Sequence, residues 1–235
     1  MKKLLWPLPL LAAVLVADAG ANQTLHYQGE ARVDGQIAYV EKHEVIFDDA
    51  GRLLEAKTLY ESPAGKPIAT MQSDFRESLT VPAHTVKDFR TGNVQGLRRE
   101  NGEIVLFYQD AGKPERTRTL TEKDAGNRIL VGCQGLNYYL LGNLERLDPK
   151  ANLPLRFLIP GKLDYYDFNL KRTGESADGI VAFEISIQDW FLRLFAPKLY
   201  VKYDKTAKHL IWYQGLSNIT NEQGDPQCVT ITYAY

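Results

Sequence analysis

The sequence lacks the features that mark several large classes of protein. Its 28 Lys and Arg residues are balanced by 29 Asp and Glu residues, for a formal net charge of -1. This balance argues against a basic nucleic-acid-binding domain, and a hydrophobic content of 44% argues against a disordered chain. No glycine-rich loop joins a strand to a helix, so we do not expect a nucleotide-binding α/β fold.

Potential metal ligands are also scarce. The four histidines (His26, His43, His84 and His209) are scattered, and neither Cys-x-x-Cys nor His-x-x-x-His occurs. Structural and catalytic metal sites usually need such closely spaced ligands. We therefore predict no metal site and no cofactor.

Long apolar runs are absent, and the one apolar run of note lies at the N-terminus. Lys2 and Lys3 precede the stretch 4–16, which is followed by Ala17, Ala19 and Ala21. This order of charged, apolar and small residues is typical of a secretory signal peptide, and the run is too short for a membrane span of about 20 residues. We predict a bacterial signal peptide over residues 1–21, cleaved near Ala19–Ala21, and a single periplasmic domain over 22–235 with no membrane span.

Cys133 and Cys228 are the only cysteines. An even number of cysteines in an exported chain favours a disulfide between them. Two buried free thiols are the alternative.

Turn signals recur at short intervals, among them Asp34-Gly35 and Asn101-Gly102. Such pairs tolerate the positive φ of tight hairpins, and the segments between them are rich in Val, Ile, Tyr, Phe and Thr. We predict a mainly β protein: a single antiparallel sheet that curls into a half-barrel or barrel. The predicted strands are 24–33, 36–47, 53–60, 66–75, 94–99, 103–109, 116–121, 128–131, 163–171, 179–187, 198–203, 209–216 and 227–235.

Two segments have a helical pattern. Over 135–147, an apolar face with helical spacing predicts the main helix, packed in or across the sheet. The members of this face are Leu136, Tyr139, Leu140, Leu144 and Leu147. A shorter helix is predicted over 189–195, with Asp189 as its N-cap and Pro197 after its end.

Several strings together resemble an uncharacterised family of exported, periplasmic bacterial β-rich proteins. The strings are Tyr39-Val40-Glu41-Lys42-His43, residues 60–66, the helix before Leu147, Phe157-Leu158-Ile159-Pro160 and residues 213–219. The resemblance implies a fold and a compartment, and no chemistry. Export, strand rhythm and helix placement are also weakly similar to the LolA/LolB-type lipoprotein carriers, at the level of fold alone.

Tyr39, Glu41 and His43 alternate along one predicted strand, so their side chains share a face. Ile37, Val45 and Phe47 lie on the same face, which indicates that this face points inward. A Glu beside a His can orient the imidazole for general-base catalysis. The alternative is a buried pair that only satisfies its own hydrogen bonds.

Three functions remain open. The first is a non-catalytic periplasmic binding protein that holds a lipid or other apolar ligand. Its candidate ligand-binding residues are Tyr39, Tyr139, Leu140, Trp190 and Phe191. The second is a cell-envelope assembly factor that offers a strand edge or the 190–195 patch to a protein partner. The third is a hydrolase that uses Glu41 and His43, and nucleic acid is not an expected partner.

Overall fold

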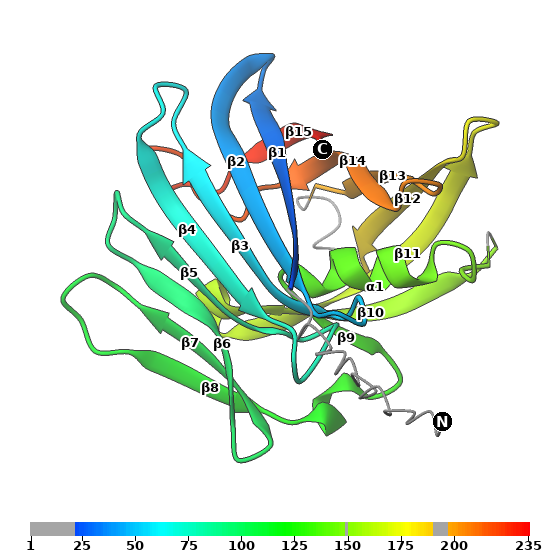
Figure 1. Cartoon of the computed structure of the whole chain (residues 1–235). Coiled ribbons are helices and arrows are strands. Elements are labelled where there is room, and N and C mark those ends of the chain that lie inside the picture. The colour runs from blue at the N-terminus through cyan, green and yellow to red at the C-terminus, as the bar shows by residue number, and fades with distance from the viewer. Residues whose placement is uncertain (1–21, 149, 190–196) are drawn as a thin grey trace, which may run out of the picture.

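The structure is a computed structural model that describes residues 22–148, 150–189 and 197–235. Its described strands form one sheet of 15 strands (Figure 1). The strands are β1 (Gln23–Val33), β2 (Gln36–Phe47), β3 (Leu53–Glu61), β4 (Pro67–Asp74), β5 (Ala83–Asp88), β6 (Val94–Glu100), β7 (Glu103–Gln109), β8 (Arg116–Leu120), β9 (Ile129–Gly132), β10 (Asn152–Ile159), β11 (Asp164–Glu175), β12 (Ile180–Ile187), β13 (Leu199–Asp204), β14 (His209–Leu216) and β15 (Cys228–Ala234). The α-helix α1 spans Gly135–Asn143, and the 3₁₀ turns η1 and η2 span Glu122–Ala125 and Pro160–Lys162. The predicted mainly β class, with one curled sheet and one main helix, is confirmed.

The order of strands in the sheet follows the chain, with one non-local junction. The order runs from β8 back to β1, then from β15 back to β9. The first and last strands therefore pair in the middle of the sheet, with Ala31 opposite Ile231. The two edges, β8 and β9, are consecutive in the chain. Every pair is antiparallel except β9 with β10.

Side chains bridge the gap between the β8 and β9 edges. Leu106 on β7 and Leu120 on β8 share a buried cluster with Leu130 on β9 and Leu158 on β10. Arg118 on β8 also forms an ion pair with Asp164 on β11, with Nη1 and Oδ1 2.5 Å apart. The sheet is thus curled almost into a barrel, and its seam is held by packing and charge in place of a β ladder.

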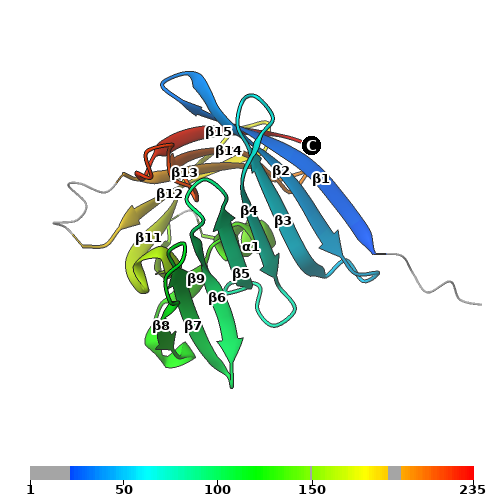
Figure 2. The same cartoon turned by 90° about the vertical axis from the view of Figure 1, so that its left-hand side faces the viewer.

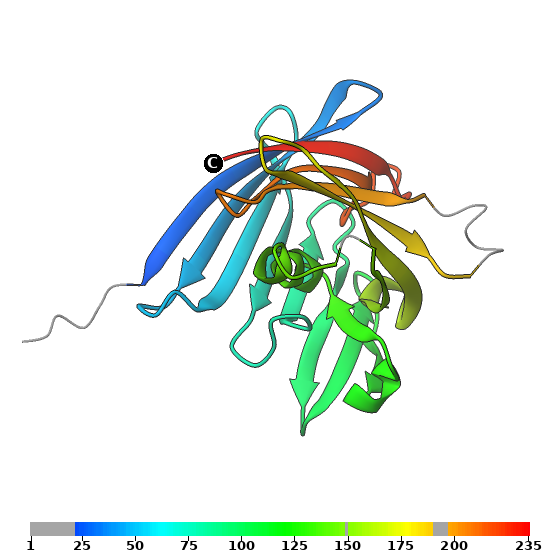
Figure 3. The ribbon, with the colours of Figure 1, turned by 90° about the vertical axis from the view of Figure 1, so that its right-hand side faces the viewer.

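Helix α1 lies inside the curl, with strands on several sides of it (Figures 2 and 3). Leu136 and Leu140 are buried against the largest core cluster, which also contains Leu144 and Leu147. The helix ends at Asn143, four residues before the predicted end, and the backbone N–H groups of Arg146 and Leu147 both bond to the Asn143 carbonyl. Gly142 and Asn143 are poor helix formers, which explains the early end.

Two strands were missed and one predicted helix lies outside the described residues. β5 is short and mixed in character, and β10 contains Pro154, which argues against a strand. Pro154 is tolerated because the parallel pairing of β10 with β9 begins only at Leu155. Of the predicted helix over 189–195, only Asp189 is described.

Candidate functional site

A pocket of about 130 Å³ lies between the inner face of the sheet and α1. One wall comes from β1 to β4, and the opposite wall comes from β10 and β13 to β15. Helix α1 and its N-cap add Gln134, Leu136, Asn137 and Leu140 to the lining. The pairing of β1 with β15 brings the two walls together, so the pocket depends on the non-local junction of the sheet.

Strand β2 supplies the central polar residues of the pocket. Its alternation buries Tyr39, Glu41 and His43, while Lys42 between them is exposed. Glu41 is 4% exposed and His43 is 7% exposed. The sequence-based prediction that this face points inward is therefore confirmed from Tyr39 to Val45, whereas Ile37, next to the bulge, is exposed.

Glu41 and His43 belong to a chain of buried hydrogen bonds. His43 Nε2 lies 3.0 Å from Glu41 Oε2, and His43 Nδ1 lies 3.0 Å from Thr58 Oγ1. The amide of Gln134 donates to Thr58 Oγ1 at 3.3 Å, and the Tyr233 hydroxyl donates to Glu41 Oε2 at 3.3 Å. With His43 Nε2 as the donor to Glu41 and His43 Nδ1 as the acceptor from the Thr58 hydroxyl, every hydrogen bond in this chain is satisfied.

Aromatic rings connect His43 with the surface. Tyr27 stacks on His43 with 4.2 Å between ring centroids, and Tyr235 stacks on Tyr27 with 4.6 Å between ring centroids. His209 stacks on Tyr235 at 3.6 Å. Burial raises the pKa of Tyr27 well above its usual value and raises the pKa of Tyr235 to about 12. Both phenols therefore remain neutral at ordinary pH.

Four more tyrosines lie around Glu41: Tyr39, Tyr60, Tyr213 and Tyr233. Burial first, and the negative charge of Glu41 second, raise the pKa of all four above the usual value of a phenol. These four phenols therefore stay neutral at ordinary pH, and no tyrosinate lies beside Glu41.

Two buried polar atoms of the lining are left without a hydrogen bond to any described residue. They are the Tyr60 hydroxyl and Gln134 Oε1. The Tyr60 side chain is fully buried, and burial raises its pKa; the nearby Asn218 side chain opposes this rise but makes no hydrogen bond of normal geometry with the Tyr60 hydroxyl. A buried polar group without a partner costs about 1–3 kcal/mol, so the burial of these two atoms is unfavourable for the fold.

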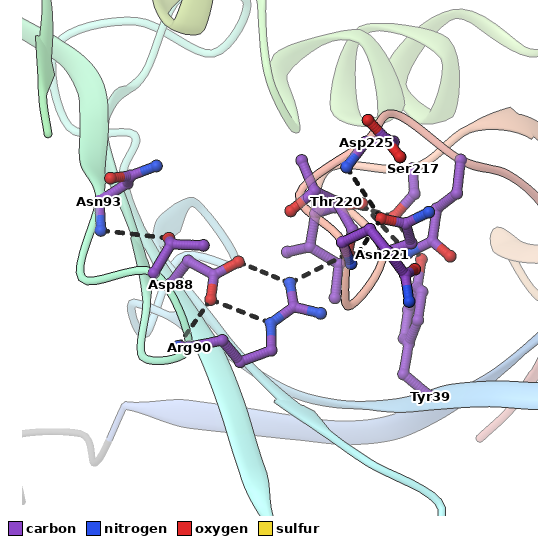
Figure 4. A network of polar contacts seen from close by, with 12 residues as sticks. Tyr39, Asp88, Arg90, Asn93, Ser217, Thr220, Asn221 and Asp225 are labelled. Atoms are coloured by element: carbon purple, nitrogen blue, oxygen red, sulfur yellow. Dashed lines mark hydrogen bonds and ion pairs between the residues drawn. The ribbon is translucent and has the colours of Figure 1, made fainter.

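The loop between β14 and β15 contributes Ser217 and Asn218 to the pocket lining, and Figure 4 shows the polar contacts of this loop. Ser217 lines the pocket, and its Oγ lies 2.8 Å from the Tyr39 hydroxyl. Arg90, in the turn after β5, donates to the Thr220 carbonyl at 2.9 Å and is held by Asp88 at 2.5 Å. The loop is therefore tied to β2 on one side and to the β5–β6 turn on the other.

Cys133 and Cys228 are free thiols in the structure, so the predicted disulfide is not formed there. Cys133 lines the pocket, with its Sγ 3.0 Å from Met71 Sδ, whereas Cys228 is exposed at the start of β15. The curl of the sheet places the two in different surroundings, which the even cysteine count could not reveal. The alternative of two buried thiols is not borne out either, because Cys133 is half-buried and Cys228 is exposed. Partial burial nevertheless raises the pKa of the Cys133 thiol to about 12.

The predicted site residues divide into three groups. The pocket is lined by Tyr39, Glu41, His43 and Leu140. Tyr139 does not line the pocket and is half-buried against the main core cluster. Trp190 and Phe191 lie outside the described residues.

Sequence reasoning missed most of the aromatic wall. Tyr27 lies directly opposite His43 on β1, and Tyr60 lies directly opposite Glu41 on β3. Hairpin pairing around β2 could have suggested these two neighbours. Tyr213 and Tyr233 reach the pocket through the β1–β15 junction, for which no local signal exists.

The order Glu41, His43, Thr58 is that of an acid, a histidine and a hydroxyl in nucleophilic catalysis. Thr58, however, is 1% exposed, is not part of the pocket lining, and already accepts a hydrogen bond from Gln134. Among the described residues, no hydroxyl or thiol of the lining is hydrogen-bonded to His43. That a hydrolase uses Glu41 and His43 therefore remains a prediction. The described lining places no accessible nucleophile in hydrogen-bonding contact with His43.

Two further searches cover the described ranges only. Over 22–148, 150–189 and 197–235, no three His, Cys, Asp or Glu side chains gather as metal ligands would. Across the same residues, no helix has the length and hydropathy that crossing a membrane would require.

Comparisons with known proteins give one structural similarity. No family model and no curated protein matches the chain. A solved structure described as a beta-barrel-like protein of domain of unknown function DUF1849, from Brucella abortus, aligns with a TM-score of 0.41 and 8% sequence identity. The alignment covers 91% of this chain and 95% of that one.

Proposed function

We propose that this chain is a non-catalytic, periplasmic binding protein that holds one small molecule in the pocket around Glu41. The observation that carries the proposal is the pair of unpartnered buried atoms, the Tyr60 hydroxyl and Gln134 Oε1, in the wall of an internal space. A bound molecule would complete their hydrogen bonds and remove the cost of burying them.

The size of the pocket narrows the ligand. Pockets for drug-sized ligands measure about 300–1,000 Å³, whereas a cavity of about 150 Å³ holds one benzene molecule. At about 130 Å³, this pocket matches a molecule of benzene size or one end of a larger molecule. A whole lipid does not fit a space of this volume, so we favour a small ligand over a lipid.

Native mass spectrometry of mature protein purified from periplasm without detergent tests the proposal. We expect a stoichiometric bound molecule of low mass, which organic extraction then identifies. Protein that is empty, and that shows no change in melting temperature with any member of a fragment library, would contradict the proposal.

A pair of leucine variants makes the test specific to the pocket. Leu140 and Leu144 are both buried, but only Leu140 lines the pocket. Leu140→Phe should fill the space and abolish binding at little cost in stability. Leu144→Phe should overpack the core and destabilise by about 1–3 kcal/mol while binding is retained by the folded protein.

The periplasmic part of the proposal rests on the pattern of residues 1–21. N-terminal sequencing of the protein recovered from a periplasmic fraction should begin at Asn22. Recovery in the cytoplasmic fraction with Met1 retained would contradict export.

A protein partner is the second candidate function. It is favoured by the two edges of the described sheet, β8 and β9, to which a partner strand could be added. Cross-linking from a photoreactive residue at exposed Thr117 on β8 should then capture a specific envelope protein. A specific cross-link should disappear when an excess of the unlabelled chain is added. If no such cross-link forms, the partner hypothesis is contradicted and small-molecule binding remains as the proposed function.

A further inference from the structure

Apart from one histidine, the ionisable side chains of the pocket lining can carry only negative charge. Glu41 contributes a carboxylate, His43 is the only side chain of the lining that can become a cation, and the described lining contains no Lys or Arg. Recognition of a carboxylate or phosphate normally relies on Arg or Lys. The lining is therefore unsuited to an anion.

The hydrogen-bonding groups left over in the lining are mainly acceptors. Gln134 Oε1 is an acceptor, an ionised Glu41 can only accept, and the Tyr60 hydroxyl can take either role. A ligand that satisfies Gln134 must therefore donate a hydrogen bond. A donor beside a carboxylate gains most when the donor itself is charged.

The aromatic wall favours the same kind of ligand. The faces of tyrosine rings carry negative potential and attract cations, most strongly where water is excluded. Tyr39 and Tyr60 meet edge to face with 5.8 Å between centroids, so their rings form two walls at an angle and not a flat stack. Tyr213 and Tyr233 line the pocket from β14 and β15.

We infer that the ligand is a small organic ammonium ion, held by the Glu41 carboxylate, by the tyrosine rings and by the acceptors Gln134 and Tyr60. This inference rests on the proposed function and specifies its ligand class. The volume of about 130 Å³ restricts the cationic group to a few non-hydrogen atoms, such as a methylated amine.

Three probes of similar shape separate charge from size: trimethylammonium, neutral tert-butanol and the pivalate anion. NMR titration is suitable because ligands with so few atoms bind weakly. We expect trimethylammonium to bind about tenfold more tightly than tert-butanol, and pivalate not to bind. Equal or tighter binding of tert-butanol or pivalate overturns the ammonium inference while leaving small-molecule binding intact. Failure of all three probes to bind overturns the inference, and an empty protein in native mass spectrometry then also overturns the proposed function.

Glu41→Gln tests the role of the carboxylate with little change of shape. It should remove the preference for trimethylammonium and leave tert-butanol binding unchanged. Glu44→Gln is the matched control, because Glu44 lies on the other face of β2 and pairs with Lys57 at 3.1 Å. An unchanged preference in folded Glu41→Gln overturns the inference.

Tyr60→Phe gives an independent test if Glu41→Gln does not fold. Its hydroxyl has no partner to lose within the described chain, so folding should be retained. We expect trimethylammonium to bind several-fold more weakly, and an unchanged affinity overturns the assigned role of Tyr60.

Discussion

The two faces of β2 hold charge in opposite ways. On the outer face, Lys42 pairs with Glu61 at 2.7 Å and Glu44 pairs with Lys57 at 3.1 Å, and both lysines remain about half exposed. On the inner face, Glu41 and His43 are buried, and their hydrogen-bond and stacking partners are polar or aromatic side chains. The outer pairs are those of an ordinary sheet surface, where water screens each charge.

The inner face is costly for the fold because two titratable groups have been removed from water. An apolar pair at these positions would avoid that cost, as buried ion pairs are often no more stable than hydrophobic substitutes. The polar interior therefore favours a role in binding over a role in stability. The predictions below test the difference between the two faces, starting with the largest expected effect.

His43→Ala should lower the free energy of unfolding by about 3–5 kcal/mol, because it leaves the buried Glu41 with the Tyr233 hydroxyl as its one described hydrogen-bond donor. It also removes the ring that stacks on Tyr27. Chemical denaturation measures the loss. The control is His26→Ala, an exposed outer-face position on β1, with an expected change within about 0.5 kcal/mol. A small loss at His43, with folding intact, would instead favour the hydrolase interpretation of Glu41 and His43.

A second buried histidine should make stability sensitive to acid. His84 on β5 is buried, and burial lowers its pKa to about 4, below the value of about 6.5 in the unfolded chain. Its contribution to stability is therefore complete above about pH 6.5 and is lost as pH falls towards 4, by about 3 kcal/mol in total. Denaturation curves between pH 7 and 4 measure this loss.

His84→Phe is the variant that isolates this effect, because it removes the titrating group from the interior. On acidification, His84→Phe should lose less stability than the wild type, by the contribution of one proton-binding site. His26→Ala should lose as much stability as the wild type. An identical pH profile for wild type and His84→Phe would show that acid destabilisation originates elsewhere.

Local sequence patterns were enough to predict the hairpins and to predict which face of β2 points inward. Both residues of Asp34-Gly35 and of Asn101-Gly102 have positive φ, as the predicted tight turns require. The bounds of β2 were predicted correctly, and so was its inward face. Short-range turn chemistry and alternation act on neighbouring residues, which is why one sequence was enough.

The opposite wall of the pocket could not be predicted in this way. Near the turn, Arg32 pairs with Ile37, but a bulge shifts the register so that Ala31 pairs with Tyr39 and Tyr27 with His43. Without that single shift, the Tyr27 side chain would leave the inner face. Tyr233 depends on the pairing of the two chain ends, which no local pattern encodes.

The two cysteines extend the comparison of inside with outside. Cys228 is exposed, whereas burial raises the pKa of the Cys133 thiol to about 12 and leaves almost no reactive thiolate near neutral pH. A thiol reagent should therefore label Cys228 in the native protein at least about 100-fold faster than Cys133. Mass spectrometry locates the label, and denaturation should make both thiols reactive. Absence of free thiol in denatured, unreduced protein would instead restore the disulfide.

The smallest effect is expected at the outer pair of Glu44 and Lys57. Both side chains are partly exposed, so the pair should contribute only about 0.2–1 kcal/mol. A double-mutant cycle with Glu44→Gln and Lys57→Met isolates this coupling, which should fall further in high salt because exposed charges are screened. A coupling as large as the loss at His43 would remove the distinction between the faces. A small, salt-sensitive coupling would confirm that β2 exposes replaceable charges outside, where their loss costs the fold little.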